Sequence, residues 1–182
     1  MKYLKKYKLF EDVDDFSKFV KNINPDIEFD YTDIPVSVLK GKIVADIIIN
    51  DDLGYSGFKT EMLIVIEEDG EYEIYKFYHE QDCCEHVSLY DVNGDLDDLI
   101  DEVLLQAEET SREATGDEVS ESGTWTFYKF ASRKGYVTLR WLGESNGYYS
   151  ERMSFVKSTT TIDSHDDLVQ VLYSKPPIYR KK

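Results

Sequence analysis

The sequence has little of what marks a secreted, membrane-spanning or disulfide-stabilised protein. Its 182 residues include two cysteines and four prolines, and no apolar run approaches the ~18 residues that a transmembrane helix needs. Residues 1–16, MKYLKKYKLFEDVDDF, contain basic residues but neither the long apolar stretch nor the small-residue cleavage site of a signal peptide. We therefore expect a protein of a reducing cytosol, without a membrane span.

The motifs of the common enzyme classes are also missing. The chain has no Walker loop, no dinucleotide-binding glycine pattern and no H-E-x-x-H metalloprotease motif. These absences predict a protein that is not an enzyme and needs no cofactor.

Positive charge is scarce in the middle of the chain. Residues 22–122 hold 28 acidic against five basic residues, and the net charge of the protein is −16. Such a field repels nucleic acid and attracts basic surfaces. The ends differ, because residues 1–21 hold six lysines against four acids and residues 123–182 hold ten basic against five acidic residues. Contact with nucleic acid is thus open only at the basic termini, Lys2–Lys8 and Arg180–Lys182.

Strands are the main predicted element. Alternation with period two and turn signals such as Asp69-Gly70 predict strands at residues 42–50, 58–68, 71–79, 124–132, 136–143 and 148–156. Helical periodicity predicts helices at residues 12–23 and 95–109, and a short helix near 164–173 capped by Ser164. The pattern predicts one α+β domain over residues 1–182, with two or three helices packed on an antiparallel β-sheet.

The predicted helix at 95–109 separates its residues into an apolar and an acidic arc when they are placed at about 100° intervals. One residue breaks the separation, since Leu105 falls inside the acidic arc. No lysine or arginine lies between Lys76 and Arg112, so no pair four residues apart offsets the repulsion between carboxylates. The pattern fits a solvated face, or a partner-binding surface that imitates the charge of DNA. The predicted partner-binding residues are Asp95, Asp97, Asp98, Asp101, Glu102, Leu105, Glu108 and Glu109.

Two adjacent cysteines lie between two histidines in the stretch HEQDCCEH, residues 79–86. His79, Cys83, Cys84 and His86 have the atom types of a zinc site, but zinc sites usually separate their cysteines by about two to four residues. The acidic neighbours also disfavour a cysteine nucleophile, because they raise the pKa of a thiol. We favour a bend at a strand edge, with the cysteines as small buried apolar residues, over a metal site.

The stretch GESNGYYSE, residues 143–151, offers a second candidate for catalysis. Glu144 and Glu151 have the chemistry of an acid–base pair, and Ser145 that of a nucleophile. However, Asn146-Gly147 between two strands is typical of a hairpin turn. The turn is the preferred interpretation.

The strings HEQDCCE and RWLGESNGYYSE resemble an uncharacterised domain family of bacteriophages and prophages. The resemblance spans residues 38–157, with residues 1–37 as an N-terminal helical addition and residues 158–182 as a C-terminal extension. It implies no catalytic residue.

The size and charge of the chain are similar to those of anti-CRISPR proteins that inhibit Cas9-type nucleases. That similarity implies action in the cytoplasm of a bacterial host. It also implies binding to the guide-loaded nuclease at its basic DNA channel or PAM-reading groove. The alternatives are a metal-binding or redox protein centred on Cys83 and Cys84, and a phage accessory protein with no inhibitor role.

Overall fold

The computed structural model describes residues 27–52 and 59–173. Within these ranges the chain forms nine strands, two 3₁₀ helices and one α-helix. The strands are β1 (Phe29–Asp30), β2 (Ile43–Asp52), β3 (Lys59–Glu68), β4 (Glu71–Tyr78), β5 (Glu85–Asn93), β6 (Gln106–Glu113), β7 (Ser122–Ala131), β8 (Tyr136–Ser145) and β9 (Ser154–Ser158). The helices are η1 (Val36–Leu39), η2 (Leu96–Asp98) and α2 (His165–Tyr173).

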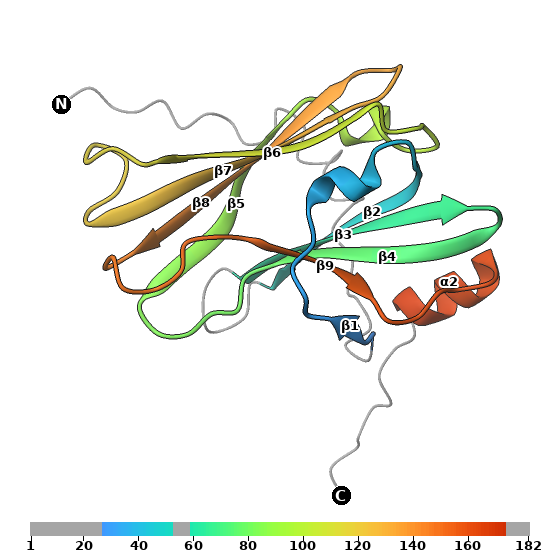
Figure 1. The fold of residues 1–182 in the computed structure, drawn as a ribbon, viewed down its shortest axis with the longest axis horizontal. Helices are drawn as coiled ribbons and strands as arrows, with labels where there is room; N and C mark the ends of the chain where they lie inside the picture. Colours follow the sequence, from blue (N-terminus) through green and yellow to red (C-terminus); the bar gives the residue numbers. More distant parts are fainter. Residues whose placement is uncertain (1–26, 53–58, 174–182) are drawn as a thin grey trace, which may run out of the picture.

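The strands form two antiparallel sheets that face each other (Figure 1). We call the five-stranded sheet, with the order β1-β9-β4-β3-β2, sheet A, and the four-stranded sheet, with the order β5-β8-β7-β6, sheet B. All strands of sheet B lie between β4 and β9 in the sequence, so sheet B is inserted into sheet A.

The main core fills the space between the sheets. It includes Phe77 of sheet A and Tyr128 and Trp141 of sheet B, each fully buried. Phe77 lies 4.7 Å from the Tyr128 ring and 4.5 Å from the Phe155 ring, measured between centroids. Aromatic rings packed at tilted angles add to the stability that comes from burial alone. The many aromatic residues therefore hold the two sheets together.

A second core covers the outer face of sheet A. Helix α2 contributes Leu168 and Leu172, which pack with Ile162 against β2, β3 and β4. Both faces of β3 are thus buried, which explains its continuous apolar run MLIVI. Ser164 accepts a hydrogen bond from the Asp167 backbone N–H at 3.1 Å, so the predicted cap of this helix is confirmed.

The predicted α+β class is wrong, because the protein is mostly β. The described residues form two antiparallel sheets and one α-helix rather than one sheet with two or three helices. The predicted helix at 95–109 is replaced by η2, an irregular segment and the first residues of β6. The predicted helix at 12–23 lies outside the described residues, as do the basic termini.

Most of the predicted hairpins are present. Asp69 and Gly70 both have positive φ, at 55° and 86°, in the turn between β3 and β4. β7 and β8 also pair as predicted. The predicted hairpin at Asn146-Gly147 is wrong, because β8 belongs to sheet B and β9 to sheet A. That turn carries the chain from one sheet to the other.

Candidate functional site

The acidic segment, residues 95–109, crosses from the end of sheet B to the edge of sheet A and back. Asp95 caps η2 by accepting a hydrogen bond from the Asp97 N–H at 3.0 Å. Val44 of β2 then exchanges backbone hydrogen bonds with the segment, accepting from Asp101 at 2.8 Å and donating to Glu102 at 3.2 Å. The Leu105 N–H donates to Ala131 of β7 at 2.7 Å. The segment therefore joins the edges of the two sheets.

These contacts explain why the segment is not a helix. Its backbone groups find partners on β2 and β7, whereas a helix would place its carboxylates side by side without a basic residue one turn away. The apolar residues that suggested a helix are still used, since Leu96, Leu99, Leu104 and Ala107 all enter the main core. Gly94 has φ of 109°, and a Cβ there would lie 2.2 Å from the Tyr136 carbonyl oxygen. Only glycine fits at this turn.

The predicted partner-binding residues are divided between exposed and half-buried positions. Asp98 and Glu102 are half-buried. The exposed members are Asp95, Asp97, Asp101, Leu105, Glu108 and Glu109.

Two of these carboxylates have basic neighbours from other parts of the chain, although no basic residue lies between Lys76 and Arg112 in the sequence. Glu102 lies 3.5 Å from the Lys134 ammonium and 4.0 Å from Arg133, both in the turn between β7 and β8. Glu109 lies 4.0 Å from Arg152, but its side chain is only 33% exposed, and this partial burial raises its pKa above the ordinary value. The folded chain therefore supplies cations that are distant in the sequence.

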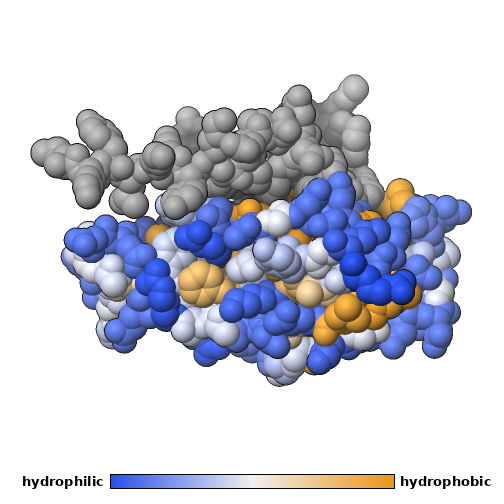
Figure 2. Space-filling view, turned by 90° about the horizontal axis from the view of Figure 1, so that it is seen from above, coloured by the Kyte–Doolittle hydropathy of each residue, from blue (hydrophilic) through white to orange (hydrophobic). Residues whose placement is uncertain are grey.

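Leu105 belongs to an exposed aliphatic group that the sequence did not predict. Val38, Ile43, Val103 and Leu105 are between 37% and 50% exposed. Ile43 pairs directly with Val103, and Leu105 follows two residues later. Val38 lies on η1, which packs against β6. In the predicted helix, Val103 would belong to the apolar arc. Figure 2 shows one face of the molecule, where hydrophobic residues interrupt a mainly hydrophilic surface.

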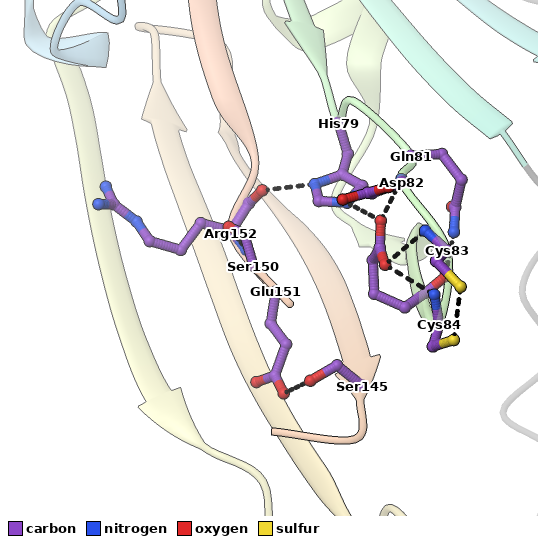
Figure 3. A network of polar contacts seen from close by, with 10 residues as sticks. His79, Gln81, Asp82, Cys83, Cys84, Ser145, Ser150, Glu151 and Arg152 are labelled. Carbon is purple, nitrogen blue, oxygen red and sulfur yellow. Dashed lines mark hydrogen bonds and ion pairs between the residues drawn. The ribbon is translucent and has the colours of Figure 1, made fainter. Parts of the chain in front are cut away.

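The cysteine turn, residues 79–85, connects β4 to β5 and is organised by one carboxylate (Figure 3). The Glu85 side chain is only 1% exposed and accepts hydrogen bonds from the backbone N–H groups of Asp82, Cys83 and Cys84. These backbone hydrogen bonds, that of Asp82 above all, lower the pKa of Glu85. His79 donates from Nδ1 to the Arg152 carbonyl at 2.9 Å, and its Nε2 lies 3.5 Å from Glu85.

The structure does not assemble the metal set that the sequence allowed. His79 is buried next to Glu85. His86 lies on β5 and pairs with Glu144 of the neighbouring strand β8. Among the described residues, no group of three or more histidine, cysteine or acidic side chains is placed to hold a metal ion. The prediction of buried cysteines is wrong, because Cys83 and Cys84 are both exposed. Hydrogen bonding to Cys83 raises the pKa of the Cys84 thiol.

Ser145 and Glu151 meet, but their environment is structural. The Ser145 hydroxyl donates to Glu151 at 2.6 Å, and the Thr124 hydroxyl donates to the same carboxylate at 2.7 Å. Together with a hydrogen bond from Ser122, these hydrogen bonds outweigh burial and lower the pKa of Glu151, which makes it a weak base. Glu144 lies across from His86 in the sheet instead of beside Glu151. The contacts hold the crossing from β8 to β9.

The fold and these surfaces define a two-sheet β protein with an exposed edge of mixed aliphatic and acidic character. The chain belongs to the family described as a domain of unknown function (DUF7448), whose model matches residues 37–155. The match runs from η1 into β9, so it includes all of sheet B and strands β2, β3 and β4 of sheet A. No curated protein and no solved structure matches the chain. Within the described ranges, no helix is long and apolar enough to cross a membrane.

Proposed function

We propose that this protein is a non-enzymatic binding protein that recognises a basic protein surface through the edge between β2 and β6. We define the binding edge as the exposed residues Val38, Ile43, Asp97, Asp101, Val103, Leu105 and Glu108. The observation that carries the proposal is the exposure of four aliphatic side chains beside these carboxylates.

Aliphatic and acidic groups have different roles in such an interface. Exposed aliphatic side chains grouped in one place provide apolar area that a partner can bury. The carboxylates steer a basic partner and select against acidic ones, which makes association sensitive to salt. The net charge of −16 extends this steering beyond the edge itself.

The partner that we propose is a DNA-handling nuclease of the host, of the guide-loaded Cas9 type. The support is the resemblance of the HEQDCCE and GESNGYYSE strings to a phage domain family, together with the acidity of the chain. Such a nuclease holds nucleic acid in a positively charged channel and reads its PAM with arginines. An acidic surface that occupies this channel would block DNA binding or cleavage in the cytoplasm of the bacterial host.

A charge-neutralising variant tests this function. The triple variant Asp97→Asn, Asp101→Asn, Glu108→Gln removes three carboxylates from the binding edge and keeps the shape of each side chain. Asparagine also suits position 101, where φ is 58°. We expect the wild-type protein to reduce target-DNA binding by a guide-loaded Cas9 in a gel shift, more strongly at low salt, and the triple variant to lose this effect.

A matched variant controls for net charge. The changes Glu113→Gln, Asp117→Asn and Glu121→Gln also remove three exposed carboxylates, but away from the binding edge. This variant should inhibit as well as the wild type. Equal inhibition by both triple variants would contradict a role for the edge, and no inhibition by the wild-type protein would exclude this nuclease as the partner. DNA that remains bound but uncut would place the block after recognition.

A metal-binding or redox role for Cys83 and Cys84 is the alternative, supported by the exposure of both thiols. Elemental analysis of protein purified without chelators separates the two functions. Zinc or iron at one equivalent per chain would favour the alternative.

A further inference from the structure

The two thiols of the cysteine turn lie together at the surface. Cys83 and Cys84 are both exposed, and their Sγ atoms are 2.7 Å apart. Figure 3 shows the sulfur atoms of Cys83 and Cys84 next to each other on the same side of the turn. The Tyr149 hydroxyl also contacts the Cys83 thiol. A ligand that reaches one sulfur atom is therefore within reach of the second.

Hydrogen bonds to the Glu85 side chain hold the backbone that carries these thiols. Glu85 accepts hydrogen bonds from the N–H groups of Cys83 at 3.2 Å and Cys84 at 3.0 Å, and the Nε2 atom of His79 lies 3.5 Å from the same carboxylate. Buried carboxylates that accept several backbone N–H groups form strong, directional contacts. The turn thus presents its two thiols without a further loss of backbone freedom on binding.

We propose that Cys83 and Cys84 form a preorganised dithiol site for trivalent arsenicals, a class of soft electrophile that bonds to two thiols at once. The site is distinct from the binding edge and does not depend on the proposed function.

A bridging atom suits adjacent cysteines better than a direct disulfide does. The Cα atoms of neighbouring residues are ~3.8 Å apart, whereas disulfides usually join Cα atoms about 4.4–6.8 Å apart. A direct bond between Cys83 and Cys84 would close a small, strained ring. An arsenic atom between the sulfur atoms enlarges that ring.

The reaction balances without an oxidant. Phenylarsine oxide condenses with the two thiols, so that two S–H bonds break and two As–S bonds form. The oxygen of the arsenical leaves as water with both thiol protons. Arsenic stays trivalent and no electrons are transferred.

Intact-mass measurement with phenylarsine oxide tests the site. The chain has only two cysteines, so Cys83→Ser and Cys84→Ser each keep a single thiol. We expect the wild-type protein to bind one equivalent, to keep it in excess 2-mercaptoethanol and to release it to 2,3-dimercaptopropanol. Each serine variant should bind on the order of 10²-fold more weakly, because the second As–S bond is lost. Serine variants that match the wild-type affinity, or two equivalents per wild-type chain, would overturn the proposal.

Further measurements separate chelation from simple reactivity and from misfolding. N-ethylmaleimide should add twice to the wild type and once to each serine variant, and an unreactive thiol would contradict the exposure on which the site depends. Oxidised glutathione should leave the free wild-type protein without an internal disulfide, and loss of two hydrogens would count against the site.

Glu85→Gln tests preorganisation, with the exposed Glu80→Gln as its control. If both variants keep the wild-type circular dichroism, only Glu85→Gln should weaken arsenical binding. Equal affinity in the two variants would show that Glu85 does not preset the thiols.

Discussion

The outer faces of the two sheets are covered in different ways. The outer face of sheet A lies under α2, whose leucines pack on β2, β3 and β4. On sheet B, the described residues place Trp125 among side chains instead, with the Tyr90 ring at 4.9 Å and the Arg140 guanidinium at 5.1 Å from its ring. A helix and a set of long side chains thus perform the same task, the removal of apolar area from water.

Each outer face also holds a cation against aromatic rings, in different surroundings. Lys76 on sheet A is 8% exposed and its ammonium lies 4.2 Å from the Phe29 ring, 5.2 Å from Tyr31 and 5.0 Å from Tyr78. Arg140 on sheet B forms an ion pair with Asp91 at 3.1 Å. Aromatic rings therefore stabilise the Lys76 ammonium, whereas Arg140 is needed to balance the charge of the Asp91 carboxylate.

The largest expected effect concerns the helix-covered face. Leu172→Ala should lower the free energy of unfolding by about 2–4 kcal/mol, because it leaves a cavity under α2. Leu142→Ala on sheet B should cost less, since the long side chains that cover this face can shift into the space. Urea denaturation measures both, and the exposed Val169→Ala on α2 should change stability by no more than about 0.5 kcal/mol. If Leu142→Ala lowers the free energy of unfolding as much as Leu172→Ala, the outer face of sheet B is covered just as rigidly as that of sheet A.

Acid titration should distinguish two carboxylates that have similar pKa values. Burial alone would raise the pKa of Glu73, but hydrogen bonds from Lys157, Tyr75 and Lys42 hold it at about 2, below its ordinary 4.5. Because the folded pKa is depressed, Glu73 stabilises the fold above pH 4.5, and this contribution is lost as the pH falls toward 2. Glu73→Gln should therefore lose about 2–3 kcal/mol at neutral pH and little near pH 2.

Glu118 beside sheet B provides the comparison. Its pKa is also about 2, chiefly through hydrogen bonding to Arg112, but the Arg112 side chain is 47% exposed. Salt screens such a pair, so Glu118→Gln should have a smaller effect that decreases at 1 M salt, whereas that of Glu73→Gln should persist. Thermal unfolding at several pH values and two salt concentrations measures both. Equal salt sensitivity would contradict the difference in burial.

The smallest expected effects on stability come from substitutions of the two cations, Arg140 and Lys76. Arg140→Met should cost about 1–2 kcal/mol at neutral pH, because Asp91 stays buried without its partner. Burial already raises the pKa of Asp91 and Arg140 opposes this, so the variant raises that pKa further and its deficit should shrink as the pH falls. Lys76→Met should change stability by less than about 1 kcal/mol, because methionine keeps the contact with the rings and needs no hydration. A larger loss at Lys76 would mean that its charge is essential.

Local patterns in the sequence predicted the parts of the fold that depend on near neighbours. The alternation in β4, the turn at Asp69-Gly70 and the Ser164 cap all involve residues a few positions apart. The helix prediction for residues 95–109 was wrong because the structure of this segment depends on Val44 and Ala131, which are distant in the sequence. The leucines of this segment are spaced in the sequence as they would be in a helix, but they belong to a 3₁₀ turn followed by an extended segment.

The candidate sites were predictable to the same extent. The sequence identified Leu105 as an apolar residue outside the core, and it is half exposed. It did not reveal Ile43 beside Val103, because that contact comes from a bridge between distant segments. The exposure of the cysteines was missed for a related reason. The buried Glu85 holds their backbone, whereas the composition suggested that the thiols themselves were buried.

The insertion of sheet B between β4 and β9 has a consequence for synthesis. Tyr78 of β4 pairs with Ser154, so β4 leaves the ribosome long before its partner strand. Until then an apolar strand edge stays open, which is a hazard for aggregation during translation. β1 pairs with β9 as well, so the first described strand also waits for the last one. A chain that ends before β9 would leave β1 unpaired and one edge of β4 open, and we expect it to accumulate in inclusion bodies.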